Sequence, residues 1–413
     1  MFVQIHMLQS VPPGNLNRDD SGQPKKCLFG GVTRGRISSQ CLKRNMRLSP
    51  LFQEAFAEQL AKRTKYLPRL VADAVVKAGV IPEKEIDGIK AGIAAQFKKE
   101  AKADAESDNT EAGDTASSAS DVTPQLVFFR PAFATKIAEL LADLRKDHPK
   151  AYKKFIGEKE KRSKEDDKAA DEAIQAFRDA ALNARESLSV DVGLFGRMTT
   201  SDIVVDVEAA CQVAHAISTH ETLIESDYFT AMDDLQQSFA TSQTQSGGAA
   251  FLGSGDTETF FSSAVYYKYV NIDTDALMKT VGDADKVRHA VAVMVQAAAL
   301  ATPTGKQNSF AAHSVPELVL VEVSKRKQPI SYANAFLEPV QGDDLMLESV
   351  RALGQYCESI AAAYAPPDTQ RFLLAVGKSA SEGLPIDSER SSTLADLASR
   401  VEKALASSPV GAK

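Results

Sequence analysis

The chain has 413 residues, of which 44% are hydrophobic and 25% are charged, with a formal net charge of −7. This composition is that of a soluble globular protein of two or three units. No run approaches the ~20 apolar residues that span a bilayer, and the first ten residues lack the leader of a signal peptide. The four cysteines show no CxxC spacing, which favours a cytoplasmic protein with free thiols over a disulfide scaffold.

The expected elements start with the first residues. Alternating apolar side chains in residues 3–7 predict a strand that opens the fold. A loop rich in Pro, Gly, Asn and Asp occupies residues 9–37, and a helix is expected to begin near Ser38 or Ser39, either of which can cap it.

Apolar residues at helical spacing then continue through most of residues 50–187. Residues 101–123 interrupt this pattern because they are small, polar and nearly free of apolar bulk, which predicts a disordered surface loop. The strongly charged stretch at 153–172 is interpreted as a solvated helix face.

The second half of the chain favours strands. Its segments alternate apolar residues or are rich in β-branched and aromatic side chains. A Gly-, Ser- and Thr-rich segment at 236–259 fits an extended hairpin or a flexible arm. The order of strand, helix, strands, helix and strand predicts an α+β fold with a split βαβ, ferredoxin-like core. The expected elements are strands at 189–196, 209–219 and 262–272, a helix at 284–301 and a strand at 317–324.

Positive charge is concentrated near the start of the chain. Residues 16–47 carry a formal charge of +6, so the remaining residues sum to −13. The overall acidity argues against a protein that coats nucleic acid over its whole surface. Phosphate binding follows local charge, however, and permits a local basic groove. Gly30, Gly31 and Gly35 let the backbone of this segment approach a ligand closely.

A helical wheel separates the polar and apolar residues of the expected helix. Leu42 and Met46 lie on one side, ready to pack on a sheet. Ser38 and Ser39 stand at the N-terminus, where free backbone N–H groups favour an anion. One-sided charge favours polyanion binding over a basic surface without a ligand. The cationic stripe is formed by Lys43, Arg44 and Arg47 with the neutral Gln40 on the same side, and the preceding loop extends it with Arg18, Lys25, Lys26, Arg34 and Arg36.

Two acidic or metal-ligand groupings are weaker candidates. Asp19 and Asp20 could bind a divalent cation, but Asp pairs commonly cap turns, and that interpretation is favoured. Cys211, His215 and His220 have a superficial likeness to metal ligands. Strand alternation places Cys211 and His215 on one face and His220 on the other, so core or surface roles are favoured.

Two loops carry further candidates. The sequence TGKQNS at 304–309 lacks the spacing of a P-loop and follows a helix, although Lys306 could touch a phosphate as a point charge. In GRMTTSD, Arg197 and Met198 are expected in a turn after a strand. Met198 could be an ordinary core residue. Equally, the pair could contact a nucleic acid, touching its backbone and inserting as a wedge against a base.

Several motifs occur together in register. LNRDD, FGG and RISSQCLKR near the start are followed by GRMTTSD, VAHAISTH, DYFTAMDDLQ, FSSAVYYKYVNI, GKQNSFAA and ISYANAF. Over residues 2 to about 340 the chain resembles the crRNA-binding backbone subunit of type I-E CRISPR Cascade, the CasC family. The helical insert around 50–185 and the tail after 340 resemble this family only in character.

The resemblance implies an α+β fold with an RRM-like, ferredoxin-like palm, a large helical insertion that forms the fingers, and a β-hairpin thumb. The segment assigned to the thumb is longer than the family pattern suggests. The implied division is palm with the basic loop and helix at 1–49, fingers at 50–187 with a disordered loop at 101–123, palm at 188–229, thumb at 230–262, palm at 263–340 and a C-terminal helical region at 341–413.

The resemblance also implies a subunit that is not an enzyme and needs no cofactor. Copies assemble head to tail along crRNA, and each thumb displaces guide bases at regular intervals. The remaining guide bases stay open for pairing with target DNA in antiviral defence. The implied partners are crRNA, the target DNA strand, further copies of the chain and other Cascade subunits, without a membrane. The basic stretch and the motifs together predict these RNA-binding residues: Arg18, Lys25, Lys26, Arg36, Ser38, Ser39, Gln40, Lys43, Arg44, Arg47, Arg197, Met198, Lys306 and Gln307.

A nuclease is the alternative function. Related backbone subunits of type III effectors cleave target RNA with a loop aspartate, so Asp19 or Asp20 could serve a metal-dependent, RNA-guided ribonuclease. The sequence shows no group of His or Glu residues that would complete an active site with these carboxylates. The structural role is therefore favoured.

Overall fold

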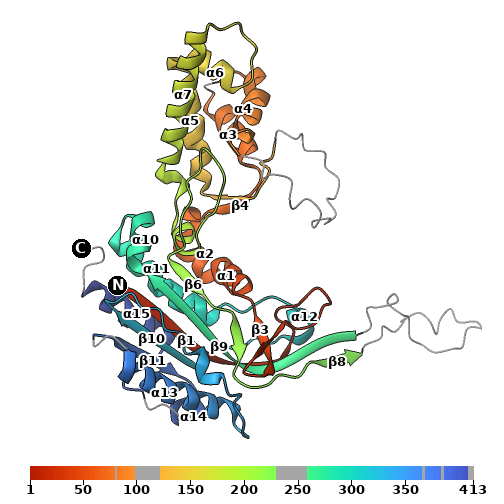
Figure 1. The fold of residues 1–413 in the computed structure, drawn as a ribbon, viewed down its shortest axis with the longest axis vertical. Coiled ribbons are helices and arrows are strands. Elements are labelled where there is room, and N and C mark those ends of the chain that lie inside the picture. Colours follow the sequence, from red (N-terminus) through yellow and green to blue (C-terminus); the bar gives the residue numbers. More distant parts are fainter. Residues whose placement is uncertain (80, 98–120, 229–257, 365–367, 383–385, 408–413) are drawn as a thin grey trace, which may run out of the picture. The chain divides into compact units, whose positions relative to one another are not determined.

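The computed structural model describes residues 1–79, 81–97, 121–228, 258–364, 368–382 and 386–407. Residues 101–120 of the predicted disordered loop and most of the predicted thumb lie outside these residues. For the end of that loop, residues 121–123, the prediction of disorder is wrong, because Thr123 is buried and its hydroxyl donates to the carbonyl of Gln125 at 2.7 Å. The chain forms two compact units (Figure 1). Residues 1–55, 211–275 and 288–413 make the sheet unit, and residues 56–210 and 276–287 make the helical unit. Within the described ranges, no helix is both long enough and apolar enough to cross a membrane.

A ten-stranded sheet organises the sheet unit, in the order β12-β11-β10-β1-β9-β7-β3-β2, while β6 and β8 pair with β9 off this path. Strand β1 runs antiparallel to both of its neighbours, with Ile5 opposite Val270 of β9 and Val321 of β10. The strands are β1 Phe2–Gly14, β2 Lys26–Phe29, β3 Val32–Ile37, β6 Cys211–Val213, β7 Ala216–Ser218, β8 Glu225–Tyr228, β9 Glu258–Asp273, β10 Leu318–Ser324, β11 Gln370–Ala375 and β12 Glu389–Arg390.

Both faces of the central strands are covered by other parts of the sheet unit. On one face, Tyr267 of β9 shares a core cluster with Leu353 of α13. On the other face, Lys268 donates from Nζ to the carbonyl of Ala298 in α11 at 3.2 Å, and burial lowers the pKa of Lys268 to about 8. Because both faces are covered, β1 and β10 are buried along most of their length, and their polar residues Gln4, His6 and Glu322 are buried as well.

Short helices and loops complete the sheet unit. It contains α1 Ser39–Leu48, η4 Ala333–Phe336, α12 Gln307–Phe310, α13 Leu345–Tyr364, α14 Lys378–Glu382 and α15 Leu394–Ala406. The residues of three further helices are divided between the units: α2 Pro50–Phe56, α10 Thr274–Val281 and α11 Ala284–Leu300.

The helical unit buries apolar stripes of its longer helices around α5. Phe133, Ile137 and Leu141 of α5 are fully buried, and Phe155 meets Phe177 at a ring-centroid distance of 5.2 Å. Its elements are η1 Ala57–Gln59, β4 Lys62–Thr64, α3 Leu67–Ala78, η2 Glu83–Glu85, α4 Ile86–Ala94, β5 Val127–Phe129, α5 Pro131–Asp147, α6 Pro149–Phe155, α7 Lys164–Leu182, η3 Arg185–Ser187 and α8 Val190–Phe195.

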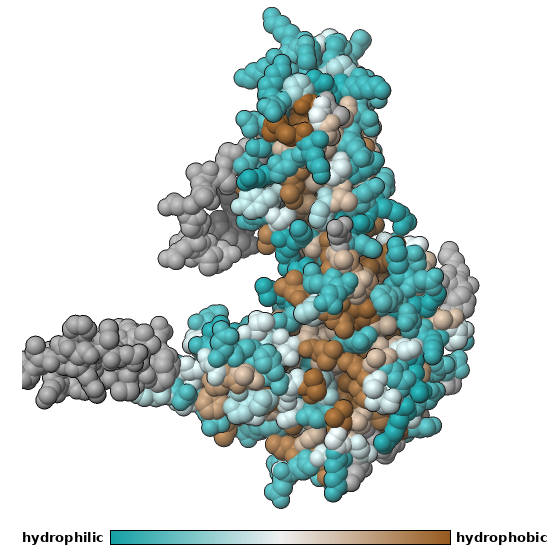
Figure 2. All heavy atoms as spheres, turned by 180° about the vertical axis from the view of Figure 1, so that it is seen from behind, coloured by the Kyte–Doolittle hydropathy of each residue, from teal (hydrophilic) through white to brown (hydrophobic). Residues whose placement is uncertain are grey.

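The charged stretch at 153–172 forms a solvated surface, as predicted. Within this unit Lys154 pairs with Asp171 at 2.8 Å, and Lys150 just before it pairs with Asp166 at 2.9 Å. Much of the face of the helical unit that Figure 2 presents is hydrophilic. Exposed pairs of this kind add little stability and keep the surface solvated.

The mixed α+β class and several predicted elements are confirmed. The opening strand is β1, the helix near Ser38 is α1, and the helix and strand expected at 284–301 and 317–324 are α11 and β10. The predicted strand at 189–196 is wrong, because Ser189 accepts the N–H of Val192 and caps the short helix α8. The single strand predicted at 209–219 is also wrong, since it breaks into β6 and β7.

Candidate nucleic-acid interface

The hairpin of β2 and β3 provides a rigid base for the basic surface. Arg34 is 0% exposed, and its Nη1 and Nη2 donate to the carbonyls of Ser218 and Phe336 at 3.0 and 2.8 Å. At Gly30, with φ +63°, an added Cβ would lie 1.7 Å from the carbonyl oxygen of Leu337, so only glycine fits there. The prediction that Arg34 extends the cationic surface is therefore wrong, because its charge is used to hold the hairpin.

Helix α1 projects its polar face from the sheet unit. Leu42 and Met46 are buried, as the helical wheel predicted, and Gln40 and Arg44 are exposed. Lys43 and Arg47 are partly exposed. With a buried apolar side and a polar outer side, the helix presents its cations to solvent.

The start of α1 is fixed by two hydrogen bonds. The Ser38 hydroxyl accepts the N–H of Cys41 at 3.4 Å, and the Ser38 N–H donates to Oδ1 of Asn17 at 2.9 Å. Ser38 therefore caps the helix, as predicted. Its side chain is only 7% exposed, so the predicted RNA contact of Ser38 is replaced by this structural role. Ser39 is partly exposed and remains a candidate contact.

A second group of cations lies on the neighbouring strand ends. Arg36 donates from Nη1 to Nδ1 of His215 at 3.2 Å and from Nε to the carbonyl of Lys26 at 3.4 Å. Burial lowers the pKa of His215, and the charges of Arg36 and Lys25 lower it further. Since an arginine only donates, Nδ1 of His215 accepts and its other ring nitrogen carries the proton.

Sequence reasoning missed His215, which it treated together with Cys211. The two were expected on one face of a strand, but Cys211 is buried and His215 is exposed. The break between β6 and β7 shifts the alternation by one face. Two short strands in place of one long strand could not be distinguished from the apolar pattern alone.

A groove of ≈ 560 Å³ in the sheet unit brings three predicted segments together. Arg18 comes from the first loop, Arg44 from α1, and Gly305 from the loop before α12. A Cβ on Gly305 would lie 2.5 Å from the carbonyl oxygen of Leu16, so the two loops approach closely. The groove is lined by Leu16, Asn17, Arg18, Asp19, Asp20, Gly22, Cys41, Arg44, Asn45, Thr304 and Gly305.

The two aspartates at this groove differ in their roles. Oδ1 of Asp19 accepts the hydroxyl of Ser21 at 2.8 Å and the N–H groups of Ser21 and Gln23, each at 3.0 Å. The Ser21 hydroxyl is the main reason that the pKa of Asp19 is lowered. Asp19 therefore fixes its own turn, and Asp20 is exposed. Among the residues described, no group of three or more His, Cys, Asp or Glu side chains could hold a metal ion.

The loop before α12 presents one of its two predicted contacts. Lys306 is partly exposed and adopts a left-handed conformation with φ +51°. Gln307 donates from Nε2 to the carbonyls of Pro303 and Ala312 at 3.0 and 3.3 Å. The amide of Gln307 thus stabilises the loop, which leaves Lys306 as the candidate contact.

Arg197 and Met198 lie in the helical unit and differ sharply in their exposure to solvent. Arg197 is 5% exposed, and it donates to the carbonyls of Val205, Phe128 and Ser187 at 2.7–2.9 Å. Burial lowers the pKa of Arg197 to about 10. The predicted nucleic-acid contact of Arg197 is therefore replaced by a structural role. Met198 is 90% exposed, which is inconsistent with the core alternative and consistent with a wedge.

The profile of the CT1975-like protein family matches residues 3–400. The chain belongs to this family. No curated protein sequence matches it. The chain is similar to a chain of a CRISPR RNA-guided surveillance complex described as pre-nicking, with 28% identity, a TM-score of 0.73, and coverage of 98% of this chain and 100% of that chain. A chain of another CRISPR RNA-guided surveillance complex has 24% identity, a TM-score of 0.64 and the same coverage, which shows the fold alone.

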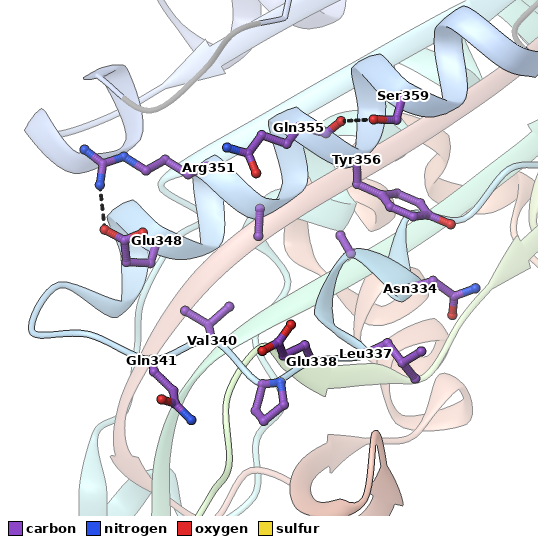
Figure 3. A pocket seen from close by; sticks show the side chains of 13 residues that line it. Asn334, Leu337, Glu338, Val340, Gln341, Glu348, Arg351, Gln355, Tyr356 and Ser359 are labelled. Carbon is purple, nitrogen blue, oxygen red and sulfur yellow. Dashed lines mark hydrogen bonds and ion pairs between the residues drawn. The ribbon is translucent and has the colours of Figure 1, made fainter.

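This CT1975-like protein also has a groove of different character beside α13 (Figure 3). Glu338, Gln341 and Glu348 line it, and Arg351 donates to Glu348 at 2.6 Å. Its volume is ≈ 670 Å³. Because the one arginine among its lining residues is already paired and two carboxylates are present, this groove does not suit a polyanion. The basic surface of the sheet unit is the better candidate for a nucleic-acid site.

Proposed function

We propose that this protein is a crRNA-binding backbone subunit of a CRISPR Cascade complex of type I-E, of the CasC kind. The observation that carries the proposal is the cationic surface of the sheet unit. There Arg18 and Arg44 line a groove between close-packed loops, and Arg36 lies at the surface beside His215. Membership of the CT1975-like family and the similarity to chains of CRISPR RNA-guided complexes support it.

The proposed subunit binds guide phosphates along this surface. Lysine and arginine contacts to phosphates neutralise charge without reading sequence, which suits a protein that must hold any guide. The remaining contacts are Lys25, Lys26, Ser39, Gln40, Lys43, Arg47 and Lys306. Met198 is proposed to stand beside a displaced base, since an exposed apolar side chain can stack against an unpaired base.

The finer architecture belongs to the same proposal. Residues 50–187 serve as the fingers and residues 230–262 as the thumb. The RRM-like palm consists of residues 1–49, 188–229 and 263–340. Copies assemble head to tail on one crRNA, displace bases at intervals, and leave the others to pair with target DNA. Other Cascade subunits join this assembly, and the subunit itself is not an enzyme.

The test is assembly on RNA of increasing length. The full chain is mixed with guide RNAs of two unrelated sequences, each in several lengths, and particle mass is measured by size-exclusion chromatography with light scattering. We expect mass to increase in regular steps with RNA length and to be independent of sequence. Particles whose mass does not depend on RNA length would contradict the proposed backbone role.

The same particles decide between a structural subunit and a ribonuclease. They are incubated with Mg²⁺ and an RNA complementary to the guide. We expect the RNA to remain intact. Cleavage that is lost in Asp19→Ala or Asp20→Ala would replace the structural role with the nuclease.

A further inference from the structure

A small hollow in the helical unit has a lining that suits an anion. It has a volume of ≈ 130 Å³, well below the ~300 Å³ at which pockets for larger organic ligands begin. Its charged lining residues are Arg130, Arg185 and Lys286, and no Asp or Glu is among the nine residues that line it. The complete lining is Gln59, Arg130, Arg185, Leu188, Ser189, Val190, Thr280, Val281 and Lys286.

The three cations come from separate elements, and Arg185 and Lys286 are exposed, whereas Arg130 is partly buried. Arg130 precedes α5, Arg185 opens η3, and Lys286 lies in the first turn of α11. Arg185 lies against the turn at Gly282, where an added Cβ would be 2.5 Å from its Nη1. The Nε atom of Arg130 is buried and has no hydrogen-bond partner within the described part of the chain. A buried donor of this kind normally has a partner.

Two of these cations stand where helix dipoles disfavour them. Arg130 is the N-cap residue of α5 and makes no side-chain capping bond. Lys286 follows the start of α11 by two residues and shares its first turn with Asp285. The N-terminal end of a helix carries partial positive charge, so a cation there is unfavourable and an anion favourable. An anion in the hollow would relieve the repulsion among the three cations and the helix ends.

Two carboxylates that lie close in sequence to lining residues are engaged in the fold. Asp191 accepts the N–H of Ala61 at 3.1 Å and the hydroxyl of Ser189 at 2.5 Å. Asp283 accepts the N–H of Lys286 at 3.1 Å. These bonds stabilise backbone and caps, so these two carboxylates have structural roles beside the three cationic side chains.

We propose that this hollow binds one tetrahedral oxyanion, the phosphoryl group of inorganic phosphate or of a nucleic-acid backbone. Two guanidinium groups and an ammonium group match the acceptors of a phosphate, and arginine can bind it with two parallel hydrogen bonds. The hollow lies in the helical unit, and the inference does not depend on the RNA-binding role of the sheet unit.

The test uses the full chain and inorganic phosphate, titrated calorimetrically at constant ionic strength in chloride buffer. Three proteins are compared with the wild type: the double variant Arg130→Gln and Arg185→Gln, the single variant Lys286→Gln, and the control Arg69→Gln. Arg69 is exposed on α3 of the same unit and does not line the hollow. Circular dichroism checks that each variant is folded. Lys286 is exposed, so Lys286→Gln should fold and still tests the hollow if the double variant unfolds.

We expect one phosphate per wild-type chain, unchanged affinity in Arg69→Gln, and affinity lower by about tenfold or more for each cation removed. Absence of phosphate binding by the wild type overturns the proposal, and so does an equal loss in the control. A short DNA oligonucleotide then identifies the source. If Lys286→Gln lowers the salt dependence of DNA binding, the phosphate belongs to a backbone. If DNA binding is unchanged while phosphate binding is lost, the ligand is free phosphate.

Discussion

Arg34 and Arg36 stand two residues apart on β3, yet their guanidinium groups have opposite environments. Arg34 is buried on backbone carbonyls, whereas Arg36 lies beside His215 at the surface. Charge counting along residues 16–47 predicted the basic surface but could not separate these two. The distinction depends on Ser218 and Phe336, which are distant in sequence and supply the carbonyls.

Charge removal on α1 should weaken RNA binding without regard to sequence. In Lys43→Ala we expect the slope of log affinity for RNA against log salt concentration to become smaller in magnitude by roughly 0.7, because one phosphate contact is lost. Two unrelated guides are compared with the wild type across a salt titration. Lys325→Ala, an exposed cation that follows β10, is the control. A strong loss on one guide and none on the other would contradict a phosphate contact.

Truncation of Arg197 should destabilise the protein. Arg197→Ala leaves the carbonyls of Phe128, Ser187 and Val205 without their donor, and we expect a loss of about 3 kcal/mol in the free energy of unfolding. Arg36→Ala is the matched control, because its guanidinium lies at the surface. It should leave stability within ~0.5 kcal/mol and weaken RNA binding. Denaturant unfolding monitored by circular dichroism measures both, and equal stabilities would refute the structural role of Arg197.

At the scale of elements, the sequence predicted long patterns well and short ones poorly. The strands β1 and β10 and the 17-residue helix α11 are rich in apolar residues and long enough for their presence to be predicted from the sequence. The short run at 189–196 satisfies both a strand and a helix pattern, and the cap at Ser189 decides for the helix. The candidate groove was predictable as a set of basic residues, but the proximity of Leu16 and Gly305 depends on tertiary packing.

The contact between these two loops should be sensitive to a single methyl group. In Gly305→Ala, the new Cβ would lie 2.5 Å from the carbonyl oxygen of Leu16 and 2.8 Å from that of Asn15. We expect about 1–3 kcal/mol of destabilisation, because backbone must move. RNA binding should also weaken, since Lys306 is displaced with the loop. Ser309→Ala, at an exposed position of α12 that does not line the groove, is the control for both measurements. A Gly305→Ala protein with unchanged Tm would show that the loops are not in tight contact.

At the scale of the whole molecule, a buried ion cluster ties the strands of the sheet unit together. Glu322 of β10 lies 3.5 Å from His6 of β1 and 2.8 Å from Arg371 of β11. Burial raises the pKa of Glu322, but His6 and Arg371 outweigh burial and lower it to about 2. A carboxyl with a lowered pKa stabilises the fold above its unfolded pKa, near 4.5, and this stability is lost as pH falls toward 2.

Acid unfolding should therefore depend on Glu322. In Glu322→Gln we expect roughly 3 kcal/mol less stability at neutral pH and a smaller loss of stability between pH 4.5 and 2. Unfolding in denaturant at several pH values, monitored by circular dichroism, measures both effects. Glu389→Gln, an exposed carboxylate of β12, should retain the wild-type pH dependence. Parallel pH curves for Glu322→Gln and the wild type would exclude the cluster as the source.

Assembly on RNA should depend on the segment between β8 and β9. All four residues of β8 are exposed, and they pair with residues 258–261 of β9 as an antiparallel ribbon. Deletion of residues 240–256, closed with Asn-Gly as a favoured hairpin turn, should give a folded monomer with an unchanged circular dichroism spectrum. It should bind short RNA weakly and fail to form long particles, because a head-to-tail contact is lost on every copy. Replacement of residues 104–121 by a short Gly-Ser linker is the control and should assemble normally. If the deletion variant builds particles of wild-type length in electron microscopy, the contact between neighbours lies elsewhere and the proposed thumb is wrong.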